Sequence, residues 1–117
     1  MGNRICLRFT DGRETSPTLY AHWTGEALLG YARRFWNEYK EKIRSEPSNW
    51  LVNFLVWFRD SPEDGGLYLY QNDNVAASPD DDGYWEFNTI TGVSTKIAMG
   101  GFDHGTPVGT EYRGYEE

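Results

Sequence analysis

The sequence has little of several features that define common protein classes. Its single cysteine, Cys6, excludes an internal disulfide framework and lies in an alternating segment, where we expect a small buried side chain. No apolar run approaches the roughly 20 residues that a membrane-spanning helix needs. The first residues also lack the apolar segment of a signal peptide. We therefore expect a cytoplasmic protein without membrane attachment.

Positive charge is scarce in the second half of the chain. Residues 60–117 carry twelve acidic and two basic side chains, a net charge of −10, whereas residues 1–59 have a net charge of +3. Proteins that grip nucleic acid do so with basic residues placed near phosphates. The distribution argues against direct nucleic-acid binding and indicates an acidic interaction surface instead.

Aromatic residues are plentiful, with five Trp, eight Tyr and six Phe in 117 residues. This content is too high for a disordered chain and predicts a core built on large rings. We expect residues 1–99 to form one domain. Residues 100–117 are glycine-rich and without periodicity, and we expect a tail that is mobile or ordered only by a partner.

An N-terminal hairpin is predicted by alternation and by a turn signal. Ile5, Leu7 and Phe9 alternate with residues that face the other side, as in a half-buried strand. Asp11-Gly12 is a strong hairpin turn dipeptide. The return strand is expected over residues 18–23, antiparallel to the first.

Two helices are predicted after the hairpin. Thr24 is the expected N-cap of a long amphipathic helix that extends toward Ile43, because apolar residues recur at spacings of three and four. Residues 50–58 are apolar nearly all round and fit either a short buried helix or a core strand. We favour the helix because Ser48 or Asn49 can cap it.

Three further strands are predicted over residues 67–70, 84–88 and 93–99, forming a meander on the same sheet. The expected fold class is α+β: an antiparallel sheet of about five strands packed against one long and one short helix.

His22 and Trp23 are the candidate residues for a ligand pocket, because they precede a predicted helix N-terminus. A structural histidine that hydrogen-bonds the turn is the interpretation we favour, since no acid or nucleophile lies at a telling spacing. Asp80-Asp81-Asp82-Gly83 lacks the spacing of a calcium-binding loop, and the two His and one Cys form no zinc pattern. We expect no metal, no cofactor and no catalytic residue.

Candidate binding residues are therefore sought among the acids of the second half. They are Asp73, Asp80, Asp81, Asp82 and Glu86. Aromatic rings in the same region could stack bases from one sheet face, as in RNA-binding sheets, but their acidic neighbours favour core packing and protein contact. These rings are Tyr68, Tyr70, Tyr84 and Trp85.

The run Leu-Tyr-Ala-His-Trp-Thr-Gly over residues 19–25 resembles small uncharacterised proteins of phages and prophages. Those proteins carry a Leu-Tyr-x-His-Trp-x-Gly run between a first hairpin and a helix. Ala21 and Thr24 stand where Ser and Gly are common in them. The resemblance implies a viral or mobile-element origin but no activity and no catalytic residue.

Three functions remain open on the sequence. The favoured one is a non-enzymatic module that binds a host protein, for example a nucleic-acid-targeting defence complex whose basic groove an acidic surface would occupy. The second is a small enzyme or ligand-binding domain with a pocket at His22 and Trp23. The third is a homodimer formed through aromatic residues and an open sheet edge.

Overall fold

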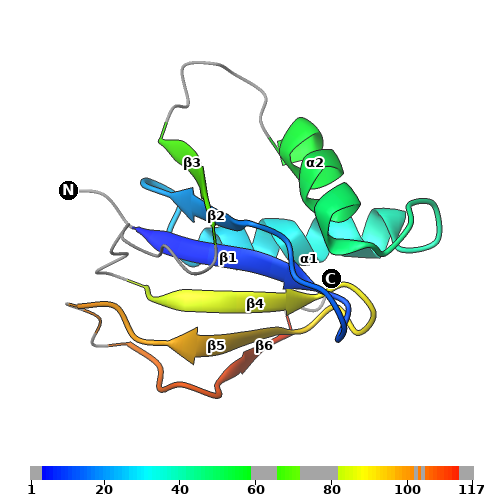
Figure 1. Ribbon diagram of the computed structural model, residues 1–117. Helices are drawn as coiled ribbons and strands as arrows, with labels where there is room; N and C mark the ends of the chain where they lie inside the picture. Colours follow the sequence, from blue (N-terminus) through cyan, green and yellow to red (C-terminus); the bar gives the residue numbers. More distant parts are fainter. Residues whose placement is uncertain (1–3, 59–65, 72–81, 102, 104, 114–117) are drawn as a thin grey trace.

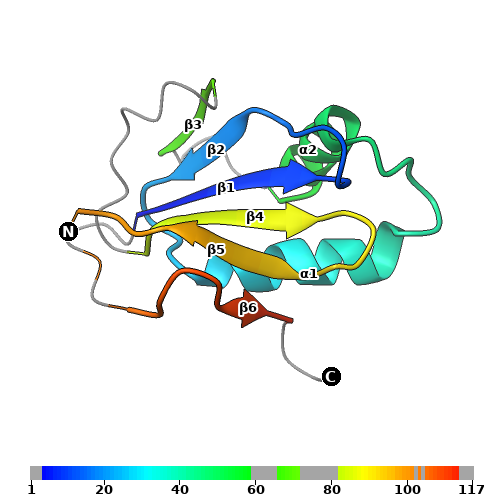
Figure 2. The same ribbon diagram turned by 60° about the horizontal axis from the view of Figure 1, so that its bottom comes forward.

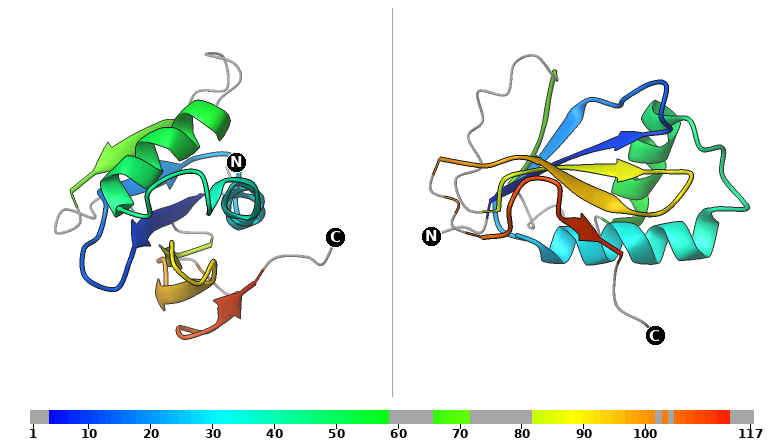
Figure 3. Two further views of the ribbon diagram at one scale, coloured as in Figure 1. Left: turned by 90° about the vertical axis from the view of Figure 1, so that its right-hand side faces the viewer. Right: turned by 90° about the horizontal axis from the view of Figure 1, so that it is seen from below.

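The computed structural model describes residues 4–58, 66–71, 82–101, 103 and 105–113 (Figure 1). Six strands form one sheet, and two helices pack on one of its faces (Figures 1 and 3). The elements in chain order are β1 (Ile5–Thr10), β2 (Thr18–Ala21), α1 (Ala27–Tyr39), α2 (Pro47–Phe58), β3 (Leu67–Tyr70), β4 (Tyr84–Asn88), β5 (Ser94–Ala98) and β6 (Glu111–Tyr112).

The predicted N-terminal hairpin is confirmed, with β1 and β2 paired antiparallel. Gly12 adopts a φ of 93°, a backbone conformation that only glycine enters without strain. Asp11 Oδ1 accepts hydrogen bonds from the amides of Glu14 and Arg13, each at 2.9 Å. These two bonds stabilise the carboxylate and lower the pKa of Asp11 below its ordinary value.

The sheet is mixed, not antiparallel, and has six strands where about five were expected. Its order is β3-β2-β1-β4-β5-β6, so β3 and β6 are the two edges (Figure 2). β1 and β4 pair in parallel from Cys6 opposite Tyr84 to Thr10 opposite Asn88. The expected meander of the last strands is correct for β4 and β5 but wrong for β3, which pairs with β2.

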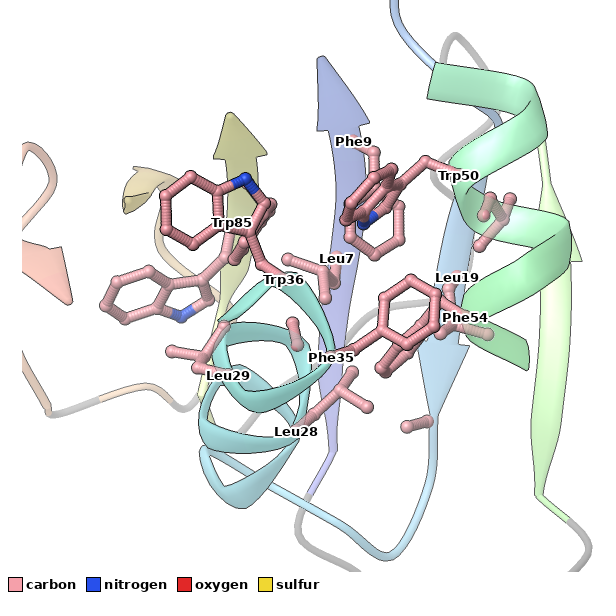
Figure 4. Packing of buried hydrophobic residues seen from close by; sticks show 14 of the residues in the cluster. Leu7, Phe9, Leu19, Leu28, Leu29, Phe35, Trp36, Trp50, Phe54 and Trp85 are labelled. Carbon is pink, nitrogen blue, oxygen red and sulfur yellow. The ribbon is translucent and has the colours of Figure 1, made fainter. Parts of the chain in front are cut away.

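The core lies between the sheet and the two helices (Figure 4). Phe9 of β1 packs edge-on against Phe54 of α2, with ring centroids 5.6 Å apart. Phe35 of α1 meets the same Phe54 at 5.6 Å and Trp50 at 5.2 Å. Each of these rings contributes about 1.5–3 kcal/mol through burial, so the ring-filled core predicted from composition is confirmed.

Both predicted helices form, and residues 50–58 are helical as favoured. Thr24 is not the N-cap of α1, because the helix begins at Ala27 after Glu26, whose side chain makes no capping bond. The amides of Leu28 and Leu29 instead bond to the carbonyls of Gly25 and Glu26. A backbone turn at Gly25, with a φ of 62°, thus supplies acceptors that a threonine hydroxyl was expected to supply.

The described part of the glycine-rich tail contains a short strand that was not expected. β6 adds to the edge of β5, with Tyr112 opposite Ser94 and Glu111 opposite Thr95. The amide of Lys96 also bonds to the carbonyl of Thr110 at 2.9 Å. The last strand therefore belongs to the sheet rather than following the domain.

Candidate functional site

A cavity lies between α1 and the C-terminal segment 106–112, at the β6 edge of the sheet. Its volume is about 480 Å³, within the usual range for small-molecule sites. The N-terminal half of α1 forms one wall, and Thr106, Thr110 and Tyr112 form the other, with Trp85 of β4 between them. The cavity thus lies between segments that are distant in sequence, and Figures 2 and 3 show β6 beside α1.

A buried ion pair holds the C-terminal wall of this cavity in place. Lys96 Nζ lies 2.5 Å from Asp103 Oδ2, and both side chains are inaccessible to solvent. The same ammonium donates a hydrogen bond to the carbonyl of Thr106 at 2.8 Å. The wall is therefore fixed to β5 by charge and hydrogen bonding, because few apolar side chains are available in this glycine-rich segment.

The surroundings of Asp103 favour its charged form. Burial by itself raises the pKa of this carboxyl, but the bonds from Lys96 and from the amide of Gly105 outweigh that effect and lower it. Gly83 allows the pair to approach, because a Cβ at this position would lie 2.6 Å from Asp103 Oδ2 and 2.7 Å from Lys96 Cε. Its φ of 79° also requires glycine.

The cavity combines an apolar floor with separated charges. Leu29 and Trp85 are almost fully buried and supply the floor. Glu26, directly before α1, and Arg34 of α1 line it from exposed positions, and neither has an ion-pair partner among the described residues. A third charged lining residue, Glu111, is paired with Arg113. Thr106 Oγ1 is buried and makes no hydrogen bond within the described part of the chain.

His22 and Trp23 lie at the opposite edge of the sheet, in what we name the aromatic cluster: Tyr20, His22, Trp23, Tyr68 and Tyr70. Their rings contact one another, with His22 and Trp23 centroids 4.4 Å apart and Tyr20 and Tyr68 centroids 5.6 Å apart. His22 Nδ1 and Tyr20 Oη are hydrogen-bonded at 2.8 Å. The cluster presents an exposed surface, because Trp23 is 58% exposed, and the cavities beside α1 and beside Cys6 are lined by neither Trp23 nor His22.

The predicted acidic residues are placed only in part. Asp73, Asp80 and Asp81 lie outside the described residues. Asp82 donates its amide to the carbonyl of Arg4, at the start of β1. Glu86 Oε2 accepts a hydrogen bond from Arg8 Nε at 2.8 Å and forms an ion pair with Arg8 Nη2 at 2.8 Å, across the parallel β1–β4 pair, so its charge is paired.

The sheet face opposite the helices carries a second, smaller cavity of about 190 Å³ beside Cys6 and Arg8. Burial raises the pKa of the Cys6 thiol to about 12, which leaves it protonated near neutral pH. Cys6 is therefore the small buried side chain expected from the sequence. Tyr84 also lines this face, whereas the Trp85 ring packs in the core.

No family model, curated protein or solved structure matches this chain. Across the described ranges, no group of three or more His, Cys, Asp and Glu side chains could hold a metal ion. None of the described helices combines the length and apolar character that crossing a membrane requires.

Sequence reasoning missed the cavity because its residues come from three separate stretches, 26–34, 85 and 106–112. One local signal was available. Lys96 is the single lysine of the second half, and in an alternating strand it occupies a helix-facing position. A lone buried cation requires a nearby acid, and Asp103 follows seven residues later.

Proposed function

We propose that the protein is a non-enzymatic module that binds a partner protein through the aromatic cluster. The observation that carries this proposal is the exposure of Trp23 and Tyr68, 58% and 51%, on a surface where their rings already contact other rings. Exposed tryptophan and tyrosine are the side chains most enriched at the energetic centres of protein interfaces. When a partner covers an exposed ring, apolar surface is removed from water, which makes association more favourable.

The cluster is preorganised, which favours binding. The amide of His22 bonds to the carbonyl of Gly66 at 2.9 Å, joining the end of β2 to the start of β3. A Cβ at Gly66 would lie 2.9 Å from Trp23 Cδ1, so the backbone there approaches the indole closely. Side chains that are already ordered lose less entropy on association.

Charge complementarity favours a partner with a basic surface. β3 is flanked in sequence by Asp60, Glu63 and Asp64 on one side and by Asp73 and Asp80 on the other. Basic grooves are typical of proteins that bind nucleic acid, and the class we propose is a nucleic-acid-targeting host complex, including defence complexes. The support is the net charge of −10 over residues 60–117, together with the resemblance of residues 19–25 to phage proteins.

The experiment compares capture of bacterial host proteins by the wild type and by two exposed-residue variants. Trp23→Ala should reduce retention of the specific partner by at least roughly tenfold, as truncation of an interface centre does. Ile90→Ala is the matched control, because Ile90 is 57% exposed but follows β4 at the other end of the sheet. Equal retention by both variants would contradict the proposal, provided that both have wild-type melting temperatures.

The charge component is tested on the same captured complex. Binding should weaken as NaCl rises, and a DNA duplex should displace the protein if the partner is of the nucleic-acid-binding class. Salt-independent binding would remove that class while leaving the aromatic cluster as the contact.

A homodimer is the second candidate, favoured by the outer face of α2. Val52 and Val56 are one helical turn apart and are 60% and 76% exposed. β3 is also an edge strand of the sheet. Light scattering after gel filtration distinguishes the two, because a homodimer would show twice the 13.5 kDa mass at micromolar concentration and Val56→Glu would restore the monomer.

A further inference from the structure

We infer that the cavity between α1 and β6 is a binding site for a short peptide with a free ammonium at one end and a free carboxylate at the other. The inference is independent of the proposed function, because the cavity and the aromatic cluster lie at opposite edges of the sheet. It rests on two features of the cavity: its size and its two unpaired charges.

The size fits a ligand of a few residues. The volume of about 480 Å³ lies within the usual range of small-molecule sites, and the cavity is open to solvent on one side. Its floor of Leu29 and Trp85 is apolar and supplies the burial that small-molecule sites use for affinity.

The two charges set the length of the ligand. Glu26 and Arg34 are eight residues apart along α1, which corresponds to about 12 Å along the helix axis. An extended peptide of three residues spans about 10 Å between its ends. Its ammonium can therefore lie beside the Glu26 carboxylate while its carboxylate lies beside Arg34, whose planar guanidinium suits a carboxylate.

The walls of the cavity are held in position before a ligand binds, which lowers the entropy cost of association. Arg34 is held over the Tyr31 ring, 5.4 Å from its centroid, which orients its guanidinium at the rim. Lys96 holds the Thr106 carbonyl, so this wall is already in position.

The orientation predicts which end each residue recognises. Glu26→Gln should weaken a peptide with a free ammonium but leave an N-acetylated peptide unaffected. Arg34→Gln should weaken a peptide with a free carboxylate but leave a C-amidated one unaffected. Both residues are exposed, so each effect should be roughly fivefold in Kd.

The test is a titration of the full chain with trialanine, followed by amide chemical shifts. We expect saturable shifts confined to residues 26–34, 85 and 106–112, at least roughly fivefold weaker binding of the acetylated and amidated trialanine, and the end-specific losses given above. Glu38→Gln and Arg44→Gln are the matched controls, because both side chains are exposed and line neither described cavity.

Three results would overturn the inference. They are equal binding of blocked and unblocked trialanine, shifts that lie outside the cavity walls, and no saturable binding at millimolar trialanine. None of them bears on the aromatic cluster, so the inference can fail while the proposed function stands.

Discussion

Lys96 Nζ and Asp103 Oδ2 lie 2.5 Å apart with both side chains wholly buried, and this pair fixes the C-terminal segment to the sheet. Removing one partner leaves an uncompensated charge in the interior. Lys96→Met should therefore lower the free energy of unfolding by about 3–5 kcal/mol, measured by urea denaturation.

The double variant Lys96→Met/Asp103→Leu tests whether the loss comes from the orphaned charge. It should be more stable than Lys96→Met alone, because no buried charge remains and the replacements have similar size. If the double variant loses the sum of the two single losses, the coupling energy between the two side chains is zero, and their interaction does not account for the losses.

The pH dependence of stability follows from the lowered pKa of Asp103. The unfolded chain protonates this carboxyl near its ordinary value of 3.8, whereas the folded chain protonates it only at a lower pH. Between these two pKa values the unfolded state therefore binds more protons than the folded state. The stabilisation is complete above about pH 4 and is lost as the pH falls through the folded pKa.

Asp103→Asn should remove this part of the acid sensitivity. Its free energy of unfolding, already lower at neutral pH, should decline less steeply than that of the wild type below about pH 4. Asp11→Asn is a useful comparison, because Asp11 also has a lowered pKa but lies in the exposed hairpin turn. If the free energies of unfolding of the wild type and Asp103→Asn fall in parallel with pH, the Lys96–Asp103 pair does not cause the loss of stability at acid pH.

Comparing Gly92 with Gly12 distinguishes the steric need for glycine from the need for a positive φ. Both Gly92 and Gly12 have positive φ, 76° and 93°, so alanine at either should cost about 1–2 kcal/mol in backbone strain. A Cβ at Gly92 would also lie 2.6 Å from the Trp36 ring, whereas one at Gly12 meets nothing within 4 Å. Thermal or urea unfolding should show Gly92→Ala less stable than Gly12→Ala by roughly 1–3 kcal/mol, as overpacking costs.

Cys6 should be chemically silent in the folded protein. Its thiol is 1% exposed, and its pKa of about 12 leaves almost no thiolate near neutral pH. Labelling by an aromatic disulfide reagent should be slow in buffer and rapid in denaturant. Fast labelling of the native chain would show that the sheet opens at β1, and Cys6→Ser under denaturant supplies the blank.

The sequence predicted those parts of the fold that depend on neighbouring residues. The Asp11-Gly12 turn and the three-and-four spacing through Phe35 are local, and each specifies one conformation. The parallel pairing of Cys6 with Tyr84 is not local, because alternation shows which side chains share a face but not which distant strand lies alongside. β6 was missed for the same reason: two residues, Glu111 and Tyr112, are too few to show a period.

The same distinction between neighbouring and distant residues applies to the candidate sites. His22 and Trp23 were singled out because they are adjacent in sequence, and the structure does bring their rings together. The α1–β6 cavity depends on Lys96 holding residues that follow it by ten positions, and no periodic pattern reports such a contact. Sequence reasoning therefore finds sites built from one stretch and misses sites assembled from several.

The two buried tryptophans of the helices differ in whether the indole N–H is hydrogen-bonded. Trp36 Nε1 donates to the carbonyl of Thr89 at 2.8 Å, whereas Trp50 Nε1 is buried with no hydrogen-bond partner in the described part of the chain. Replacing either indole by benzothienylalanine keeps the ring shape and removes only the N–H. At position 36 this leaves the Thr89 carbonyl without its donor and should cost about 1–3 kcal/mol.

At position 50 the same replacement removes a buried donor that has no acceptor, so it should be neutral or stabilising by up to about 1–3 kcal/mol. Because the two substitutions are chemically identical, their difference in unfolding free energy isolates the hydrogen bond from ring packing. Equal losses at both positions would mean that Trp50 Nε1 finds an acceptor in solution. A smaller loss at position 50 would confirm that Trp50 Nε1 is unpaired in the folded protein. Packing of the Trp50 ring, whose centroid lies 5.2 Å from that of Phe35, then outweighs the cost of the unpaired N–H.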